Sequence, residues 1–516
     1  MKAALPKGTA MDFGKDRKKD GMGSLSVDTR RVSTENAPVP VFCETPKDKS
    51  ARLVKPPIKK PMGISMTEGA PWRHTVRFAI PVLAGALLQQ LYSTVDMMIV
   101  GRFTGENALS AVGTTGSFVF LLLTVALGLS AGNGVIVSQR YGAEDEQGVR
   151  ENAAAGIVLM TVLGIAATAF GIAVSRTACV HLIAVPDEIL DDTLLYFRIY
   201  SLGLVFQYGY NAVSSILRAV GDSLSTLYFL VISSILNILL DLLFVAVFRW
   251  GVAGAAVATG IAQAASLAAA CFYMNRKYPV FRFHFRDFRW QTSKIAETIR
   301  IGLPISLHLM VVSVGLTFIQ RAVNGFGPAM IASFTVGHRI ELYLNLPCHA
   351  FQTTLATFTG QNFGAGKLDR VRSGTRQTLL ISVGMTLIIS LLVWTSASWV
   401  VELFALGDEA ASYCLQHIRA VAFINIILSL YLPLFGVFQG TGHSIVPMVV
   451  VIGALGVRVF VTYLFRYSPF LGYSIIWWNG TFGFGTGCLI AWAYYFSGRW
   501  MTGQGARGGK IPARRA

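Results

Sequence analysis

Charged side chains are scarce in this sequence. Asp, Glu, Lys and Arg make up only 14% of its 516 residues, whereas about 25% is usual for soluble domains. Hydrophobic residues make up 53%, which excludes a disordered chain and is untypical of a cytosolic enzyme. The six cysteines show no CxxC spacing, so the sequence predicts neither a disulfide framework nor a zinc site.

Motifs for nucleotide binding and catalysis are lacking as well. The segment Gly364–Leu368 resembles part of a phosphate-binding loop. However, Gln361 stands where that loop needs its first glycine, and Leu368 where it needs serine or threonine. No nucleophile–base pair is evident in the sequence. We therefore expect no enzyme activity and no nucleotide as the energy source.

Long apolar runs are abundant. A helix that crosses the hydrocarbon core of a bilayer needs about 20 mostly apolar residues. Between residues 76 and 497 there are twelve such runs, centred near residues 88, 120, 161, 203, 236, 263, 312, 343, 385, 423, 456 and 484. The sequence therefore predicts an all-α membrane protein with twelve transmembrane helices.

Basic residues outnumber acidic ones and give a net charge of +17. They flank the apolar runs, so we expect a membrane surface as their partner and no nucleic acid. Because Lys and Arg favour cytoplasmic loops, we expect a multi-pass protein of the plasma (inner) membrane with both termini in the cytoplasm. The expected parts are a disordered basic cytoplasmic tail (1–72), a first lobe of six spans (73–275), a cytoplasmic linker (276–300), a second lobe of six spans (301–497) and a basic cytoplasmic tail (498–516).

The two halves of the chain resemble each other at an offset of 221–224 residues. With an even number of spans in each half, the two repeats are expected to run parallel, and transporters built from such repeats bind substrate between them and alternate access by rocking. The matching positions are Pro81 and Pro304, Gln139–Ala143 and Gln361–Ala365, Val149-Arg150 and Val371-Arg372, Arg198 and Arg419, Gly221 and Gly442, and Gly251 and Gly472.

Acidic residues inside the first-half spans are the most informative polar residues. Asp96 falls in the first span and Asp241 in the fifth, with Asn237 one helical turn before Asp241. An ionised side chain at the bilayer centre is costly. If both acids face one pocket, one must hold a proton or a cation must lie between them, and oxygen ligands suit a hard cation. The alternative is that Asp96 caps a helix end and Asp241 pairs locally.

The second half lacks this acidic pattern, because Arg458 and Thr462 stand at the offset positions of Asn237 and Asp241. It has polar residues of its own. Arg339 and Glu341 are expected to pair locally or to lie near the membrane interface, while contact of Glu341 or Arg458 with a substrate is the alternative.

Together these motifs resemble the MATE family, the multidrug and toxic-compound extrusion transporters of the MOP superfamily, in its prokaryotic type with an acidic cation site in the N-lobe. The resemblance covers residues 76–497. It implies two six-helix lobes in a V-shape around a central cavity. It also implies a secondary active antiporter that exports small amphipathic, often cationic compounds in exchange for entering Na⁺ or H⁺.

The resemblance also implies roles for individual residues. Asp96, Asn237, Asp241, Thr259 and the Ala255 carbonyl match the cation site, whereas Gln89 and Asn211 match residues that line the same pocket; Glu341 and Arg458 are further candidates for lining the substrate pocket. Apart from Na⁺ as a coupling ion, no cofactor or metal is expected, and we expect a monomer surrounded by membrane lipid. The alternatives are a flippase for lipid-linked oligosaccharide precursors, and a receptor or channel without transport.

Overall fold

The computed structural model describes residues 64–182, 185–404, 406–469 and 471–502. By its contacts the chain divides into residues 1–58 and Lys59–Ala516, and the fold below is that of the second unit alone. Its described residues form helices and no strand, which confirms the all-α prediction. The predicted tail up to residue 63 and the end of the chain from residue 503 lie outside the described residues.

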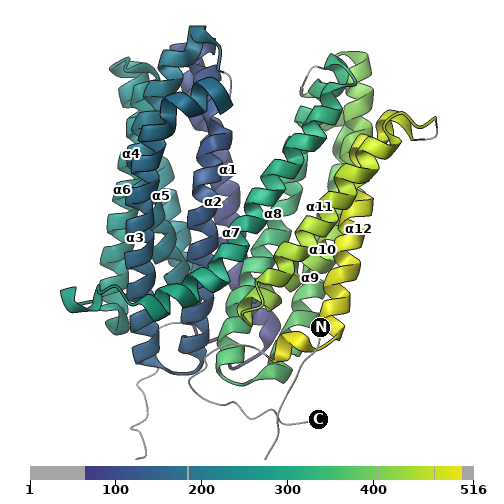
Figure 1. Ribbon diagram of the computed structural model, residues 1–516. Coiled ribbons are helices and arrows are strands. Elements are labelled where there is room, and N and C mark those ends of the chain that lie inside the picture. Colours follow the sequence, from purple (N-terminus) through teal and green to yellow (C-terminus); the bar gives the residue numbers. More distant parts are fainter. Residues whose placement is uncertain (1–63, 183–184, 405, 470, 503–516) are drawn as a thin grey trace, which may run out of the picture. The chain divides into compact units, whose positions relative to one another are not determined.

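Twelve long helices account for most of the described residues of this unit (Figure 1). The helices of the first half are α1 (Pro71–Thr104), α2 (Glu106–Gly142), α3 (Glu146–Thr177), α4 (Asp187–Ala219), α5 (Ser223–Asp241) and α6 (Gly251–Lys277). Those of the second half are α7 (Thr292–Asn324), α8 (Pro328–Gly364), α9 (Leu368–Glu402), α10 (Asp408–Gly440), α11 (Ile445–Phe465) and α12 (Ile475–Phe496). Each predicted span centre falls inside one of these helices.

Short helical segments extend or connect the long ones. Two are π-helical, η1 (Ala178–Leu182) and η2 (Leu242–Val247). Four are 3₁₀ turns, namely η3 (Pro279–Phe281), η4 (Phe285–Asp287), η5 (Gly472–Ser474) and η6 (Arg499–Met501). Because η2 directly continues α5, the helix changes its pitch immediately after Asp241, and such π-helical turns often occur at functional sites.

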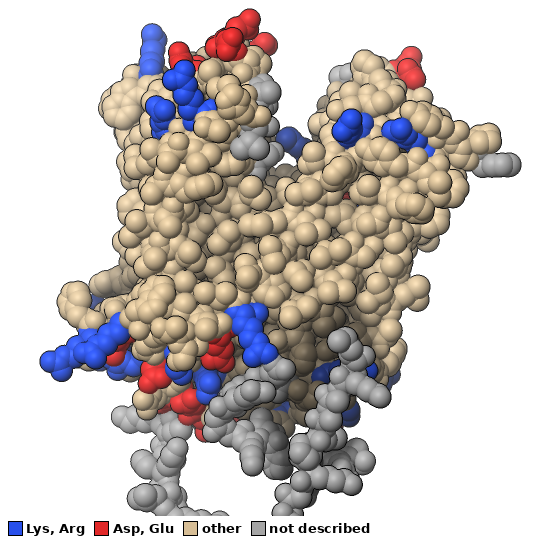
Figure 2. Space-filling view, viewed as in Figure 1, with Lys and Arg blue, Asp and Glu red and all other residues tan. Residues whose placement is uncertain are grey.

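The surface of this unit is that of a membrane protein. Among the described helices, nine are long and apolar enough to cross a membrane by length and composition. Figure 2 shows charged side chains gathered at the two ends of the helices, with a broad band of uncharged residues between them on the face in view. This distribution fits a bilayer around the middle of the helices, since charged groups are costly in hydrocarbon.

Two predicted boundaries differ from the structure because the flanking residues are packed. Met66, assigned to the disordered tail 1–72, is 1% exposed, and the Arg370 guanidinium donates to three main-chain carbonyls of residues 66–69. That prediction is therefore wrong for residues 64–72. The connection between α6 and α7 is also shorter than the predicted linker 276–300, because α7 begins at Thr292 and buries Ile295.

Helices α1–α6 pack mainly with one another, as do α8–α12, whereas α7 packs on both α2 and α11. The halves are also joined by contacts of α1 and α2 with α8. Small residues make the α2–α7 contact close. A Cβ atom added at Gly128 would overlap Ser306, and one added at Gly132 would lie 2.6 Å from Gly302. Such close backbone approach is a common way for membrane helices to associate.

A reciprocal pair of hydrogen bonds also joins the halves. Gln139 Nε2 of α2 donates to the Gly440 carbonyl at the end of α10, and Gln361 Nε2 of α8 donates to the Ala219 carbonyl at the end of α4, both at 2.8 Å. Gln361 also accepts a hydrogen bond from the Met66 amide. These contacts lie at the end of the bundle where residues 64–70 and 499–502 are found, which we call the chain-end face.

The turns of the two halves share backbone geometry. Left-handed φ angles occur at Gly105 and Gly327 (96° and 94°), and at Gly221 and Gly442 (88° and 86°). These positions are 222 and 221 residues apart, which is the spacing of the sequence matches. Glycine is required there because other residues rarely adopt such φ angles.

Candidate ion and substrate site

The acidic residues of the first half meet where α1, α5 and α6 pack together. Asp96 lies two helical turns before the end of α1, so it does not cap that helix. Asp241 is the last α-helical residue of α5 and is completely buried. The two carboxyl groups face each other closely enough to interact. The two acids thus lie close together, as our first interpretation expects, and Asp96 does not have the capping role of the alternative.

The oxygen atoms of this pair lack partners. Asp96 Oδ1, both carboxylate oxygens of Asp241 and Asn237 Oδ1 are buried and accept no hydrogen bond from the described residues. Buried polar groups are nearly always hydrogen-bonded. Such a group of buried acceptors favours protonation of one carboxyl group or binding of a cation.

The remaining predicted ligands come from α5 and α6. Asn237 Nδ2 donates to Thr259 Oγ1 across a distance of 3.4 Å, which links the two helices. Ala255 precedes Thr259 by one turn and is buried in an apolar cluster that includes Val245 of η2. The structure thus brings all five predicted residues to the region where the three helices meet.

Two pocket-lining predictions receive less support from the geometry. The Asn211 amide donates to the Gln207 carbonyl of its own helix at 2.8 Å, which satisfies it locally. Gln89 is exposed on α1. Neither residue has a described hydrogen bond to the acidic pair.

Three tyrosines that the sequence analysis missed lie around the acids. Tyr92, Tyr196 and Tyr200 each interact electrostatically with Asp96. Tyr196 and Tyr200 stack with ring centroids 5.9 Å apart. Tyr92 could have been found from the sequence, because it precedes Asp96 by four residues and therefore shares its helix face. Tyr196 and Tyr200 could not have been found in this way, because they belong to α4 and reach the acids only through the packing of the helices.

The second half contains a different polar cluster. Glu341 Oε2 lies 3.0 Å from His338 Nδ1, and Arg458 Nε donates to Asn479 Oδ1 at 2.8 Å. The Arg458 guanidinium also lies 4.9 Å from the ring centroid of Phe484. Unlike the acids of the first half, these charged groups are therefore engaged.

The predicted local pairing of Arg339 with Glu341 is wrong. Residues two apart on a helix point in different directions, and the partner of Glu341 is His338, one turn earlier. Arg339 instead lines a surface cavity together with α1 residues such as Met98. The sequence analysis also missed His417, whose ring stacks between Phe334 and Trp477 of the same half.

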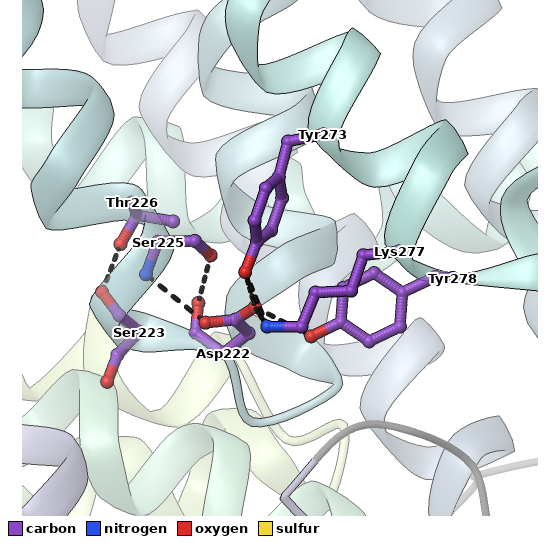
Figure 3. A network of polar contacts seen from close by, with 7 residues as sticks. All are labelled: Asp222, Ser223, Ser225, Thr226, Tyr273, Lys277 and Tyr278. Carbon is purple, nitrogen blue, oxygen red and sulfur yellow. Dashed lines mark hydrogen bonds and ion pairs between the residues drawn. The ribbon is translucent and has the colours of Figure 1, made fainter.

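An anchored carboxylate lies at the chain-end face, at the start of α5 (Figure 3). Asp222 caps α5 by accepting from the Ser225 amide, and its other oxygen accepts from Tyr273, Lys277 and Tyr278 at 2.6–3.0 Å. Burial alone raises the pKa of Asp222, but these hydrogen bonds outweigh it and hold the pKa below its usual value. This carboxylate is therefore fully satisfied and ties α5 to α6.

Comparison with known proteins identifies the family. The sequence model of the MatE family matches this chain twice, at residues 81–243 and 304–464. The chain belongs to the MatE family. As a MatE protein with many apolar helices, it is a multi-pass membrane protein.

Relatives and solved structures resemble the chain over most of its length. It is 29% identical to the probable multidrug resistance protein YpnP of Bacillus subtilis, over 84% of this chain and 97% of YpnP. It is 23% identical to YoeA of the same organism, also named a probable multidrug resistance protein, over 82% of this chain and 93% of YoeA. A solved outward-facing multidrug resistance MATE transporter superposes with a TM-score of 0.80 at 23% identity, covering 85% of this chain and 98% of that one.

Proposed function

We propose that this protein is a secondary active efflux antiporter, which exports small amphipathic and mostly cationic compounds in exchange for Na⁺ or H⁺ entering the cell. Two relatives named as probable multidrug resistance proteins, one of which shares nearly its whole length with this chain, support the efflux part of the proposal. The unpartnered acids of the first half support the coupling part.

The observation that carries the coupling proposal is the set of buried acceptors around Asp96 and Asp241. An entering cation or proton would bind between these carboxylates, with Asn237, Thr259 and the Ala255 carbonyl as further oxygen ligands. Its binding relieves the repulsion between two buried negative charges, so the packing of α1 against α5 and α6 should differ between the loaded and empty states. Such a difference would allow the ion to bias substrate release on one side of the membrane.

We further propose that the halves are parallel repeats that move relative to each other, with both termini in the cytoplasm. The two segments that match the family begin at residues 81 and 304, which are 223 apart, and the left-handed glycines recur at 221 and 222 residues. The reciprocal hydrogen bonds of Gln139 and Gln361 would close the chain-end face, and they would break when access changes. In that case the chain-end face is the cytoplasmic one.

The decisive experiment measures efflux of ethidium from cells or proteoliposomes that contain Asp96→Asn or Asp241→Asn protein. We expect both variants to lose ion-driven efflux, because an amide neither binds a proton nor attracts a cation as a carboxylate does. Asp187→Asn, a change at an exposed acid of α4, is the matched control and should leave efflux unchanged. Undiminished efflux in both pocket variants would overturn the coupling proposal, and imposed Na⁺ or pH gradients would identify the ion.

The alternative of a flippase for lipid-linked oligosaccharides loses part of its support. Arg339 and Arg458 favoured it weakly, because a phosphorylated lipid suits a cationic cavity. In the structure the Arg458 guanidinium is held by Asn479 and Phe484, and it interacts with the Glu341 carboxylate. It therefore does not present a free positive charge.

A further inference from the structure

A groove at the chain-end face of the second half is not used by the proposed transport mechanism. Helices α9 and α12 both pack on α10, and Tyr495 of α12 interacts with Thr375 of α9. Between α9 and α12 lies a cavity of about 640 Å³, with Leu430 of α10 in its lining. This volume is within the roughly 300–1,000 Å³ that is typical of small-molecule sites.

The α9 wall changes from charged to apolar along its length. Arg372, Arg376, Leu379 and Val383 line the groove, and their spacing of four, three and four residues places them on one helix face. The two arginines belong to the first turns of α9, next to the chain-end face. The apolar side chains continue toward the middle of the helix, where the bilayer would lie.

The opposite wall is aromatic and preformed. Trp500 stacks on Tyr495 with centroids 5.3 Å apart and donates its indole N–H to the Tyr495 carbonyl. Trp492 packs edge-on against Tyr495 at 5.6 Å. Gly498, with a φ of 69°, allows the chain to turn so that Trp500 can pack back on α12. These contacts already fix the side chains of this wall, so binding a ligand there would cost little conformational entropy.

The two arginines have little negative charge near them. The carboxylate nearest to Arg372 is Asp369 at 3.6 Å, and that side chain is fully exposed on the same helix. Arg372 also contacts the sulfur of Met501. Arg376 has no hydrogen bond or ion pair with any residue that the structure describes.

The first half shows how the corresponding groove is filled. There α3 and α6 pack on α4, and η3 of the connecting segment packs on both α3 and α6. Phe281 of η3 is completely buried. Arg150, which matches Arg372 at an offset of 222, donates from Nε to Asp287 Oδ2 at 3.1 Å. An apolar body and a carboxylate of the same chain thus occupy this groove.

We propose that the groove between α9 and α12 binds an anionic glycerophospholipid, whose phosphate lies between Arg372 and Arg376 and whose acyl chain lies against Trp492 and Leu379. Guanidinium groups match the geometry of phosphate oxygens. Basic pockets between transmembrane helices at one membrane surface commonly bind anionic headgroups. In the first half, Asp287 supplies the negative charge and Phe281 the apolar group. In the second half, the phosphate and the acyl chain of the lipid would take these two places.

Other occupants fit less well. The sequence after residue 502 contains four basic residues, no acidic one and a single large aliphatic residue, Ile511, so it offers no acidic side chain to the two arginines. A cationic substrate would be repelled by them. Inorganic phosphate would leave the aromatic wall in contact with water, which costs free energy in proportion to the apolar area.

The test measures the affinity of the delipidated full-length protein for phosphatidylglycerol and for phosphatidylcholine, by native mass spectrometry from detergent. We expect phosphatidylglycerol to bind more tightly, and the double variant Arg372→Ala/Arg376→Ala to weaken its binding by on the order of 10- to 30-fold. Val383→Trp, which fills the groove without changing charge, should weaken it similarly. Arg286→Ala/Arg289→Ala removes two exposed arginines of the connecting segment and should change the affinity by less than about twofold.

Each outcome decides for or against the groove. Equal affinity for the two lipids, or an equal loss in the connecting-segment control, would mean that binding is not specific to this groove and would overturn the proposal. Full competition by inorganic phosphate would also overturn it, because the site would then recognise a free anion. Selective loss in both groove variants, each with an unchanged melting temperature in the absence of lipid, would support the proposal.

Discussion

The two halves of this protein share a backbone plan but differ in how their buried charges are satisfied. Their turns use left-handed glycines at matching positions, and each half contributes one glutamine that holds a helix end of the other. In the first half, however, Asp96 and Asp241 have buried oxygens without partners. In the second half, Glu341 is paired with His338, and Arg458 with Asn479.

This difference indicates a division of labour. An unpartnered buried charge costs free energy and persists where function requires it, whereas a paired one can serve packing. The unpartnered acids of the first half support our proposal that this half binds the coupling ion. The second half has an internally satisfied polar cluster that stabilises its core.

The largest expected effect separates the two halves by function and by stability. Asp241→Asn should lower the gradient of a neutral substrate by about fifty-fold, the value of one charge crossing 100 mV. It should not lower the melting temperature, because it removes a buried charge that lacks a partner. Glu341→Gln should instead destabilise the protein by about 3 kcal/mol, since it leaves His338 and Arg458 without their counter-charge.

Efflux assays and thermal unfolding in detergent check these two variants side by side. If both variants lower the melting temperature equally, then the buried acids of the two halves do not differ in how well they are paired, and the contrast is wrong.

The next effect concerns the close contact between the halves. A methyl group at Gly142 would overlap the Gln361 carbonyl, and one at Gly364 would overlap the Gln139 carbonyl. Gly142→Ala and Gly364→Ala should each disfavour closure of the chain-end face by up to about 3 kcal/mol. Spin labels at the exposed positions Gln147 and Ser373 should then report longer distances between the halves.

Gly113→Ala is the control for that experiment, because no atom lies within 4 Å of the added Cβ. If only one of the variants Gly142→Ala and Gly364→Ala lengthened the distance, the two contacts would differ in energy although their geometry is alike.

A third comparison concerns acid stability. His443 stands at the offset position of Asp222. Burial lowers the pKa of His443, so its share of stability is lost as the pH falls below about 6.5. The pKa of Asp222 is also lowered, and its contribution is present above about pH 3.9 and lost only as the pH falls below that value.

Asp222→Asn should therefore cost about 2 kcal/mol at neutral pH and nothing at pH values below the native pKa. His443→Gln should flatten the decline of stability between about pH 6.5 and 5. Melting temperatures measured across pH would check both, and a decline near pH 6 that persists in the His443 variant would contradict the assignment.

The smallest expected effect tests the reciprocal glutamines. Gln139→Ala removes one bond between the halves, whereas Gln361→Ala also removes the bond to the Met66 amide. We expect losses of about 1 kcal/mol for Gln139 and about 2 kcal/mol for Gln361 in the stability of the closed chain-end face. The same label distances measure this. Gln416→Ala, at an exposed position of α10, should have no effect.

Much of the fold could be predicted because apolar composition is a local property. All twelve helices follow from runs of hydrophobic residues, and Asn237 and Asp241 follow from their spacing on one helix. The folded segment around Met66 could not be predicted, because its order depends on carbonyl contacts with Arg370, about three hundred residues later. The pairing of Glu341 was mistaken because sequence proximity to Arg339 does not reveal the direction of a side chain on a helix.

The sequence by itself predicted the twelve long helices that the described residues form, an internal spacing near 222 residues and two acids in apolar surroundings. These features follow from composition and periodicity, which do not depend on distant contacts. Only the tertiary structure decided that the two acids face each other without partners, that Tyr196 and Tyr200 lie around them, and that the second half keeps an open groove where the first half is filled. Those features depend on which helices pack together, and that is set by the summed burial and close backbone contacts of the entire bundle.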